Sequence, residues 1–200
     1  MVAANVRRRL SVEDRRAELI DLGIEIFSRH AYDALSTEAL ATKAGVSRGL
    51  LYHYFRDKRD FYLATVREMA RRLVEATAPD PELGFEAALR SSLERFVRFV
   101  GENPALYQAI VRGGVGSDRE MDDLLEGVRR VSLDRVQDRL GVAAPPPALR
   151  ILLYGWVGFT ETAALEWSKS RDLPHDELVE LLAGALTSRL PPHLTRTGRG

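Results

Sequence analysis

Apolar residues recur at helical spacing along nearly the whole chain, and no segment alternates between polar and apolar residues as a strand would. The first helical segment runs from about Val12 to Arg29, where Ile20, Ile24 and Phe27 share one face. The pattern therefore predicts an all-α fold.

Two shorter helical segments and one longer segment follow, and polar caps separate them. Ser36 is placed to cap a helix over Thr37 to Lys43, and Gly45 interrupts the helical pattern after it. Ser47 caps a third helix that ends near Phe55, and a longer helix follows Asp57 and reaches about Ala76. The N-terminal part is thus predicted to hold three helices and the start of a long connecting one.

Proline, asparagine and glycine divide the rest of the chain into five further helices. We expect these helices at residues 80 to about 100, 103 to about 113, 117 to 141, 148 to about 170, and 174 to about 190. The polar end of the chain, residues 191–200, is expected to be a disordered tail.

The stretch TEALATKAGVSRGLLYHYF, which begins at Thr37, fits two short helices that cross at a steep angle. Gly45 lies in the turn, where a left-handed backbone conformation favours glycine. The apolar residues at the positions where the helices would meet are Leu40, Ala44, Val46, Leu51 and Tyr54. This arrangement is a helix-turn-helix, whose second helix normally lies in the DNA major groove.

Gly49 stands inside the second of these helices, where glycine costs about 1 kcal/mol relative to alanine. At about 100° per residue, Gly49 and His53 point away from the core when Leu51 and Phe55 face it. A missing side chain on that outer face lets the helix sit deep in a groove. Arg48, on the first turn, can then reach the O6 and N7 atoms of guanine.

Several polar groups near this helix suit phosphate oxygens. The hydroxyls of Ser47 and Tyr52 and the imidazole of His53 can donate to them, whereas Tyr54 is either a phosphate contact or a core aromatic residue. Lys58 lies in the first turn of the next helix, where the helix dipole disfavours a cation by about 0.3 to 1 kcal/mol. An external phosphate would remove that cost.

Charge and composition favour a soluble cytoplasmic protein with a local basic surface. The formal net charge is 0, but residues 36–59 carry +3, with two acidic residues against five basic ones: Lys43, Arg48, Arg56, Lys58 and Arg59. The absence of cysteine excludes disulfides, thiolate catalysis and cysteine-ligated metals. No signal peptide and no apolar run of membrane-spanning length is recognisable, so we expect a cytoplasmic protein with no membrane partner.

An enzyme is the main alternative class of function, and the sequence does not favour it. The four histidines are scattered and lack the spacing of a metal site: His30, His53, His175 and His193. No nucleophile elbow or phosphate-binding loop is present. We therefore predict no catalytic activity, no metal and no cofactor. A purely structural helical scaffold would leave the basic patch unexplained.

The stretch FSRHAYDALSTEALATKAGVSRGLLYHYFRDKRDFYLATV resembles the N-terminal DNA-binding domain of the tetracycline repressor (TetR) family, over roughly Arg15 to Val66. By motif position, the resemblance implies these DNA-facing residues: Thr37, Ser47, Arg48, Gly49, Leu50, Tyr52, His53 and Lys58. Two positions depart from the family pattern. Ala31 replaces a frequent glycine, so the first helix ends either without a left-handed cap or with a strained one. Leu50 replaces a frequent polar residue and can touch only a thymine methyl.

The resemblance also implies a domain plan and a mode of action. It comprises a flexible basic arm (residues 1–11), a helix-turn-helix domain (12–56) and an all-helical body for effector binding and dimerisation (57–190), in which residues 57–77 connect the two. Arg7, Arg8 and Arg9 of the arm either enter a minor groove or remain in solvent. We expect a homodimeric regulator, a repressor that a small molecule releases from a near-palindromic double-stranded DNA operator.

Within the body, aromatic residues are either core or pocket. We expect some to line an effector pocket for an apolar or aromatic molecule, and the candidates are Phe96, Phe99, Tyr107, Trp156 and Phe159. The long helix near residue 155 is apolar on almost every side, which implies burial on more than one face. With the last helix it is expected to form the dimer interface, through Gly155, Gly158, Leu178, Leu182 and Leu186.

Overall fold

A computed structural model of the protein describes residues 11–111 and 119–195. In these two ranges every regular element is helical, which confirms the all-α prediction. The elements are α1 (Val12–Phe27), η1 (Tyr32–Ala34), α2 (Thr37–Lys43), α3 (Arg48–Tyr54), α4 (Lys58–Ala76), α5 (Phe85–Glu102), α6 (Pro104–Val111), α7 (Arg119–Leu140), α8 (Pro147–Ser170), α9 (His175–Thr187) and α10 (Pro192–Thr195).

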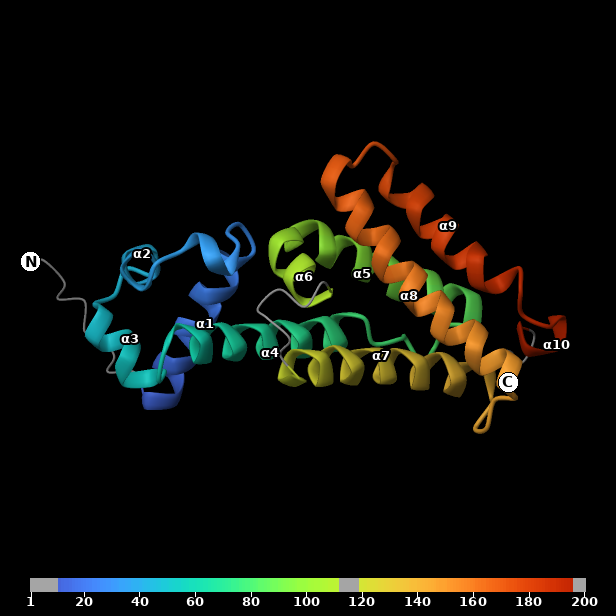
Figure 1. Cartoon of the computed structure of the whole chain (residues 1–200). Coiled ribbons are helices and arrows are strands. Elements are labelled where there is room, and N and C mark those ends of the chain that lie inside the picture. Colours follow the sequence, from blue (N-terminus) through green and yellow to red (C-terminus); the bar gives the residue numbers. More distant parts are fainter. Residues whose placement is uncertain (1–10, 112–118, 196–200) are drawn as a thin grey trace, which may run out of the picture.

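The molecule is elongated, with a small head at one end and a larger body at the other (Figure 1). The head consists of α1, α2, α3 and the first turns of α4. Helix α4 runs from the head into the body, where it lies beside α7. The other long helices, α5, α8 and α9, pack on one another in the body. The predicted connecting helix is thus a continuous link between the two parts.

Side-chain caps fix where the short helices of the head begin. The hydroxyls of Ser36 and Ser47 each accept a hydrogen bond, at 3.1 Å, from a backbone N–H at the start of their helix. The Asp57 carboxylate accepts from the Asp60 N–H at 2.8 Å. Such a cap stabilises a helix by about 1 kcal/mol. The predicted starts of α2, α3 and α4 are confirmed.

The turn between α2 and α3 contains a residue with a left-handed backbone, whereas the end of α1 does not. Gly45 has φ +65°, the left-handed conformation expected of it. Ala31 is extended at φ −61°, and α1 ends at Ser28 with a right-handed backbone. Of the two ways in which α1 was expected to end, the chain therefore uses the unstrained one.

One hydrophobic core joins the head to the body. It includes Leu40, Leu51 and Phe55 of the helix-turn-helix, all at most 1% exposed, and continues into Tyr107 of α6 and Leu165 of α8. A second core lies between α5, α8 and α9. The packing of the head is therefore continuous with that of the body.

Two boundary predictions are wrong. The helix expected from Asp80 begins only at Phe85, because the Asp80 carboxylate accepts from the Glu82 N–H at 2.9 Å and forms a turn. Residues Pro192–Thr195 form the short helix α10 inside the expected disordered tail. The basic arm up to residue 10, the expected cap at Ser117 and the end of the chain lie outside the described residues.

Candidate functional site

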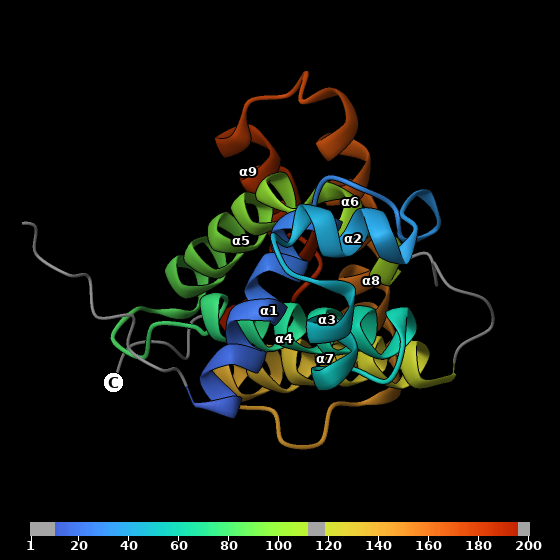
Figure 2. The ribbon, with the colours of Figure 1, turned by 90° about the vertical axis from the view of Figure 1, so that its left-hand side faces the viewer.

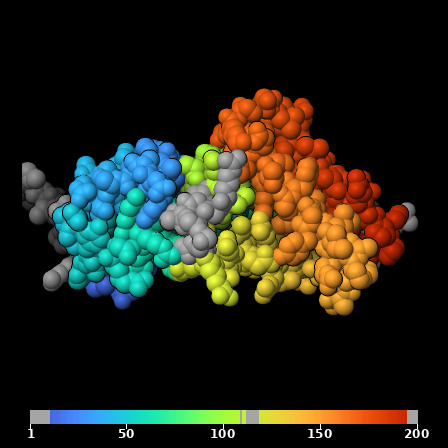
Figure 3. All heavy atoms as spheres, in the orientation of Figure 1, coloured from blue at the N-terminus to red at the C-terminus, as the bar shows by residue number. Residues whose placement is uncertain are grey.

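The outer face of α3 is open to solvent at the free end of the head. Figure 2 looks at this end and shows α2 and α3 toward the viewer, and Figure 3 shows their surface at the tip of the molecule. Gly49 and His53 are exposed, whereas Leu51 and Phe55 are buried, as the helical projection predicts. A Cβ atom added to Gly49 would meet only the Ser47 Oγ, at 4.0 Å. Nothing within the described chain therefore requires glycine at this position.

Arg48 is held across the helix-turn-helix by two neighbours. Its Nη1 lies 2.7 Å from Glu38 Oε1, and its guanidinium carbon lies 5.4 Å from the centre of the Tyr52 ring. The Arg48 and Glu38 side chains are 61% and 64% exposed, so the ion pair contributes only about 0 to 1 kcal/mol. A guanine edge can compete for the guanidinium at low cost. The sequence did not reveal Glu38 as its partner.

Thr37 and Tyr52 meet each other. The Tyr52 hydroxyl donates to Thr37 Oγ1 at 3.2 Å and ties the start of α2 to the middle of α3. Tyr54 packs against the core of the head, so of its two expected roles the structure favours the core. His53 stacks edge-on against Tyr54 with ring centres 5.0 Å apart and keeps its exposed edge toward solvent.

Lys58 has a neighbour that the sequence did not indicate. Its Nζ lies 3.8 Å from the centre of the Tyr32 ring, a cation–π geometry. Burial raises the pKa of the Tyr32 hydroxyl, and the charges of Asp57 and Asp33 raise it further, so the ring stays neutral. The ring offsets part of the dipole cost of a cation in the first turn of α4.

The basic patch is partly neutralised within the chain. Arg48 pairs with Glu38, Arg56 lies 3.4 Å from Asp60, and Arg59 lies 3.8 Å from Glu120 of α7. A hydrogen bond from the Arg56 backbone N–H lowers the pKa of Asp60, which keeps that carboxylate charged. The local potential is therefore weaker than the count of charges suggests.

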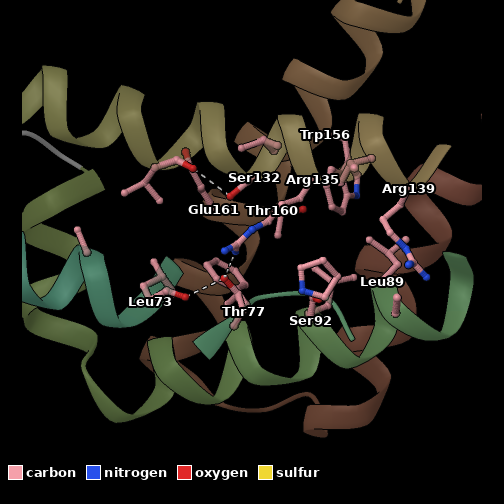
Figure 4. A pocket seen from close by; sticks show the side chains of 18 of the residues that line it. Leu73, Thr77, Leu89, Ser92, Ser132, Arg135, Arg139, Trp156, Thr160 and Glu161 are labelled. Carbon is pink, nitrogen blue, oxygen red and sulfur yellow. Dashed lines mark hydrogen bonds between the residues drawn. The ribbon is translucent and has the colours of Figure 1, made fainter. Parts of the chain in front are cut away.

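A second feature of the molecule is a cavity of about 130 Å³ in the body (Figure 4). Its walls come from α4, α5, α6, α7 and α8 and the loop after α4, and they are mostly apolar. At about 10 to 15 Å³ for each water molecule, the space suits a ligand of roughly ten non-hydrogen atoms.

Three of the five aromatic residues expected at a pocket line this cavity: Phe96, Tyr107 and Trp156. Phe99 and Phe159 do not. Phe99 packs beside the core shared with the head, and Phe159 is 42% exposed on the outer side of α8. Helical spacing alone did not identify the face that each of these two residues occupies.

The polar part of the lining comes largely from α7 and was not foreseen. Ser132, Arg135 and Arg139 follow Val128 at spacings of three and four residues, so one face of α7 meets the cavity. Glu161 of α8 is also in the lining, and Arg129 binds both of its carboxylate oxygens, at 3.0 and 2.7 Å. The spacing of these residues in α7 indicates that they share one face of the helix. Because most of them are polar, the sequence pattern suggested that this face is exposed to solvent.

The expected dimer residues fall into two groups. Leu178, Leu182 and Leu186 are at most 2% exposed, because α9 packs them against α5 and α8 of the same chain. Their assignment to a dimer interface is therefore wrong. Gly155 is exposed and Gly158 half-buried, and an added Cβ at either would have no atom within 4 Å.

The large apolar side chains beside these glycines face solvent. Ile151, Tyr154 and Phe159 of α8 are 69%, 44% and 42% exposed, and Leu181 of α9 is 53% exposed. We call these four residues, together with Gly155 and Gly158, the outer strip of α8 and α9.

Among the described residues, no cluster of three or more histidine, aspartate or glutamate side chains has the arrangement of a metal site. None of the helices that the structure describes combines the length and apolar character needed to cross a bilayer.

Comparison with known proteins gives the same family for both parts of the chain. Residues 19–72 match the family described as "Bacterial regulatory proteins, tetR family". Residues 85–188 match the family described as "Tetracyclin repressor-like, C-terminal domain". Together the two matches span the head, the connecting helix and most of the body.

Curated relatives include both activators and repressors of transcription. The HTH-type transcriptional activator FasR of Mycolicibacterium smegmatis is 25% identical over 177 residues, 86% of this chain and 81% of the relative. The repressor AcnR of Corynebacterium diphtheriae is 34% identical over 79 residues, 40% of each chain.

Solved structures share the fold. A TetR-family regulator from Streptomyces coelicolor superposes with a TM-score of 0.84 at 29% identity, covering 90% of this chain and 81% of that one. The regulator FadR from Bacillus subtilis, solved with stearoyl-CoA, gives a TM-score of 0.70 at 16% identity and covers 88% of this chain and 99% of that one.

Proposed function

The chain belongs to the tetracycline repressor family of bacterial transcriptional regulators, and on that premise we propose that it is a homodimeric, ligand-responsive repressor of a near-palindromic operator. The observation that carries the proposal is the bare, exposed face of α3 at Gly49, which the protein's own packing does not require. We assign the chain no catalytic role and expect it to act in the cytoplasm, where bacterial DNA lies.

In this proposal α3 enters the major groove with Gly49 toward the floor of the groove. Arg48 leaves Glu38 and donates to the O6 and N7 atoms of a guanine. Leu50, half-buried beside it, contacts a thymine methyl. These residues supply the contacts that distinguish one sequence from another.

Other residues hold the head on the DNA backbone. Ser47 and His53 donate to phosphate oxygens, and Lys58 binds a phosphate at the N-terminus of α4. The hydrogen bond between Tyr52 and Thr37 fixes the position of α2 relative to α3. In this proposal the two side chains lie at the edge of the helix-turn-helix that faces the DNA backbone. These contacts position the protein without reading sequence.

This assignment predicts two different losses. A selection from a random duplex library yields the operator, and Arg48→Ala should then lower affinity by about 1 to 3 kcal/mol at particular base pairs only. Lys58→Ala should weaken binding to all sequences alike and reduce the slope of log affinity against log salt by about one. Fluorescence anisotropy at several salt concentrations measures both.

Lys43, on α2 and outside the proposed contact set, is the matched control. Lys43→Ala should leave the base preferences of wild type in place. If Arg48→Ala and Lys58→Ala caused the same sequence-blind loss, Arg48 would not read bases.

The dimer forms, in this proposal, through the outer strip of α8 and α9 rather than through the leucines first expected. Two copies related by a two-fold axis would bury the exposed apolar side chains and bring glycine backbones close together. The two recognition helices would then face half-sites about 34 to 36 Å apart.

The double variant Ile151→Glu/Leu181→Glu is expected to sediment as a monomer and to lose binding to the full operator, since each half-site alone binds weakly. Val12→Glu places one such charge on an apolar residue of α1 that is 60% exposed, and this variant should stay dimeric. Analytical ultracentrifugation distinguishes the two. A double variant that remains dimeric would refute the strip as the interface.

The cavity is the proposed effector site, and it touches the two elements that hold the head. Met69 and Leu73 of α4 and Ile110 of α6 are in its lining, while the Ser28 hydroxyl of α1 donates to Asn103 Oδ1, just before α6, at 2.8 Å. An effector that fits better when α4 and α6 move would shift the heads and release the operator. The ligand of FadR carries no weight here, since 16% identity shows the fold alone.

A further inference from the structure

Arg135 lies in the cavity wall with part of its hydrogen-bonding capacity unused. Its Nη1 donates to the backbone oxygen of Val74 at 2.8 Å and lies 3.4 Å from Thr77 Oγ1. Figure 4 shows the guanidinium turned toward Thr77 within the lining. The Nε and Nη2 groups donate to nothing in the described part of the chain. A guanidinium has five N–H donors in a planar fork, so most of this fork is free.

No nearby carboxylate in the described chain neutralises the positive charge of Arg135. No carboxylate of residues 11–111 or 119–195 lies within 4 Å of it, and burial alone lowers the pKa of its guanidinium. Of the two other arginines near the cavity, Arg129 binds Glu161, whereas Arg139 uses Nη1 and Nη2 on the carbonyls of Pro81 and Leu83 and so has fewer N–H groups to offer than Arg135. A half-buried arginine remains charged at neutral pH, and a cation without a partner in a mostly apolar wall is unfavourable.

Two hydroxyls in the same lining add to this imbalance. The Oγ atoms of Ser92 and Thr160 are buried and have no hydrogen-bond partner, and the Thr160 residue is 6% exposed. Buried polar groups in native proteins are nearly always satisfied. The described lining therefore presents a guanidinium with free N–H groups, that of Arg135, and two unsatisfied hydroxyls among apolar walls.

We infer that the effector is an amphipathic monoanion, an apolar body of roughly ten non-hydrogen atoms with a single carboxylate that the fork of Arg135 binds. The inference rests on the proposed function, because it takes the cavity as the effector site. The carboxylate accepts from Nε and Nη2, and the apolar body lies against Leu73, Phe85 and Trp156.

Matched pairs of probes test whether the cavity prefers a negatively charged ligand. The pairs are octanoate with octan-1-ol and decanoate with decan-1-ol, and each probe is titrated into the full-length protein in a calorimeter. Each carboxylate should bind at least about tenfold more tightly than its alcohol, about 1.4 kcal/mol at 25 °C. Octylamine should bind more weakly than either partner of the eight-carbon pair. Equal affinities for acid and alcohol, or no binding of any probe, would overturn the inference.

Variants of two arginines on α7 test whether Arg135 causes the preference for the carboxylate. Arg135→Gln should reduce the preference for the carboxylate to about twofold or less, while octan-1-ol binds as before and shows that the cavity is intact. Arg135→Lys, which keeps the charge, should retain part of the preference and serves if the glutamine variant does not fold. Arg130→Gln changes an exposed arginine of the same helix and should behave as wild type. A preference that survives Arg135→Gln contradicts the role of Arg135.

Retention of duplex DNA, measured on the same protein without probe, separates the two proposals. DNA binding without a carboxylate preference would overturn the effector class alone. A carboxylate preference that depends on Arg135, in a protein that binds no DNA sequence selectively, would overturn the regulatory function and leave the ligand chemistry in place.

Discussion

Replacing Gly49 by leucine is expected to weaken binding to the selected operator by at least about a hundredfold, about 2.7 kcal/mol, without lowering the free energy of unfolding. A side chain on the outer face of α3 would hold the helix away from the groove floor. Arg48 and its neighbours would then lose their base contacts together, and each lost contact costs about 1 to 3 kcal/mol. Binding is measured by fluorescence anisotropy, and stability by urea unfolding.

The reason to expect no loss of stability is local. A Cβ at Gly49 meets only the Ser47 Oγ at 4.0 Å, and removing a helical glycine stabilises a helix by up to about 1 kcal/mol. Gly127 of α7 is the matched control, since a Cβ there has no atom within 4 Å. Gly127→Leu should leave operator affinity unchanged. Wild-type affinity in Gly49→Leu, or an equal fall in both variants, would show that α3 does not enter the groove as proposed.

Local signals explain why the head could be predicted closely from sequence. Ser36, Ser47 and Asp57 each cap the helix that follows them, and a cap acts within one turn of the chain. Gly45 adopts the conformation that favours glycine. Such signals do not depend on the rest of the fold, so the starts of α2, α3 and α4 were predicted to the residue. Asp80 shows the limit, since the same kind of side chain also closes a turn.

Long-range partners were outside the reach of sequence patterns. Lys58 was expected to need an external anion, but Tyr32, which is 26 positions earlier in the printed sequence, supplies a ring beside it. Arg48 was expected to reach a guanine, and without DNA it meets Glu38 across the turn. In both cases the partner is brought into place by how the helices cross, which local spacing does not encode.

The body was harder to predict because its apolar helices have more than one apolar face. Leu182 and Leu181 of α9 are neighbours in sequence, yet the first is 0% and the second 53% exposed. A stripe of leucines shows that a face is buried, but not whether its own chain or a partner covers it. The cavity poses a similar problem: Arg135 lies among polar residues on α7, and only the packing of α4 and α5 turns its side chain inward.

The closest packing in the head predicts the second large effect. A Cβ atom added to Gly23 of α1 would stand 2.4 Å from Thr65 Oγ1 and 2.8 Å from Phe61 Cζ of α4. Thr65 and Phe61 are both 0% exposed, so neither can turn into open space. Gly23→Ala should therefore destabilise the protein by about 1 to 3 kcal/mol, as overpacked cores do. Urea unfolding measures the loss.

A second substitution shows whether this steric contact is the cause. Thr65→Ala removes the nearest atom, and it also removes the hydrogen bond that Thr65 Oγ1 donates to the Phe61 carbonyl at 2.9 Å. The double variant Gly23→Ala/Thr65→Ala should recover about 0.5 kcal/mol or more relative to the sum of the single losses, since contacting sites are not additive. Gly127→Ala, which adds the same methyl group in open space, should be neutral or stabilising. Additive losses would mean that α1 and α4 are less closely packed at Gly23 than the contact with Thr65 Oγ1 implies.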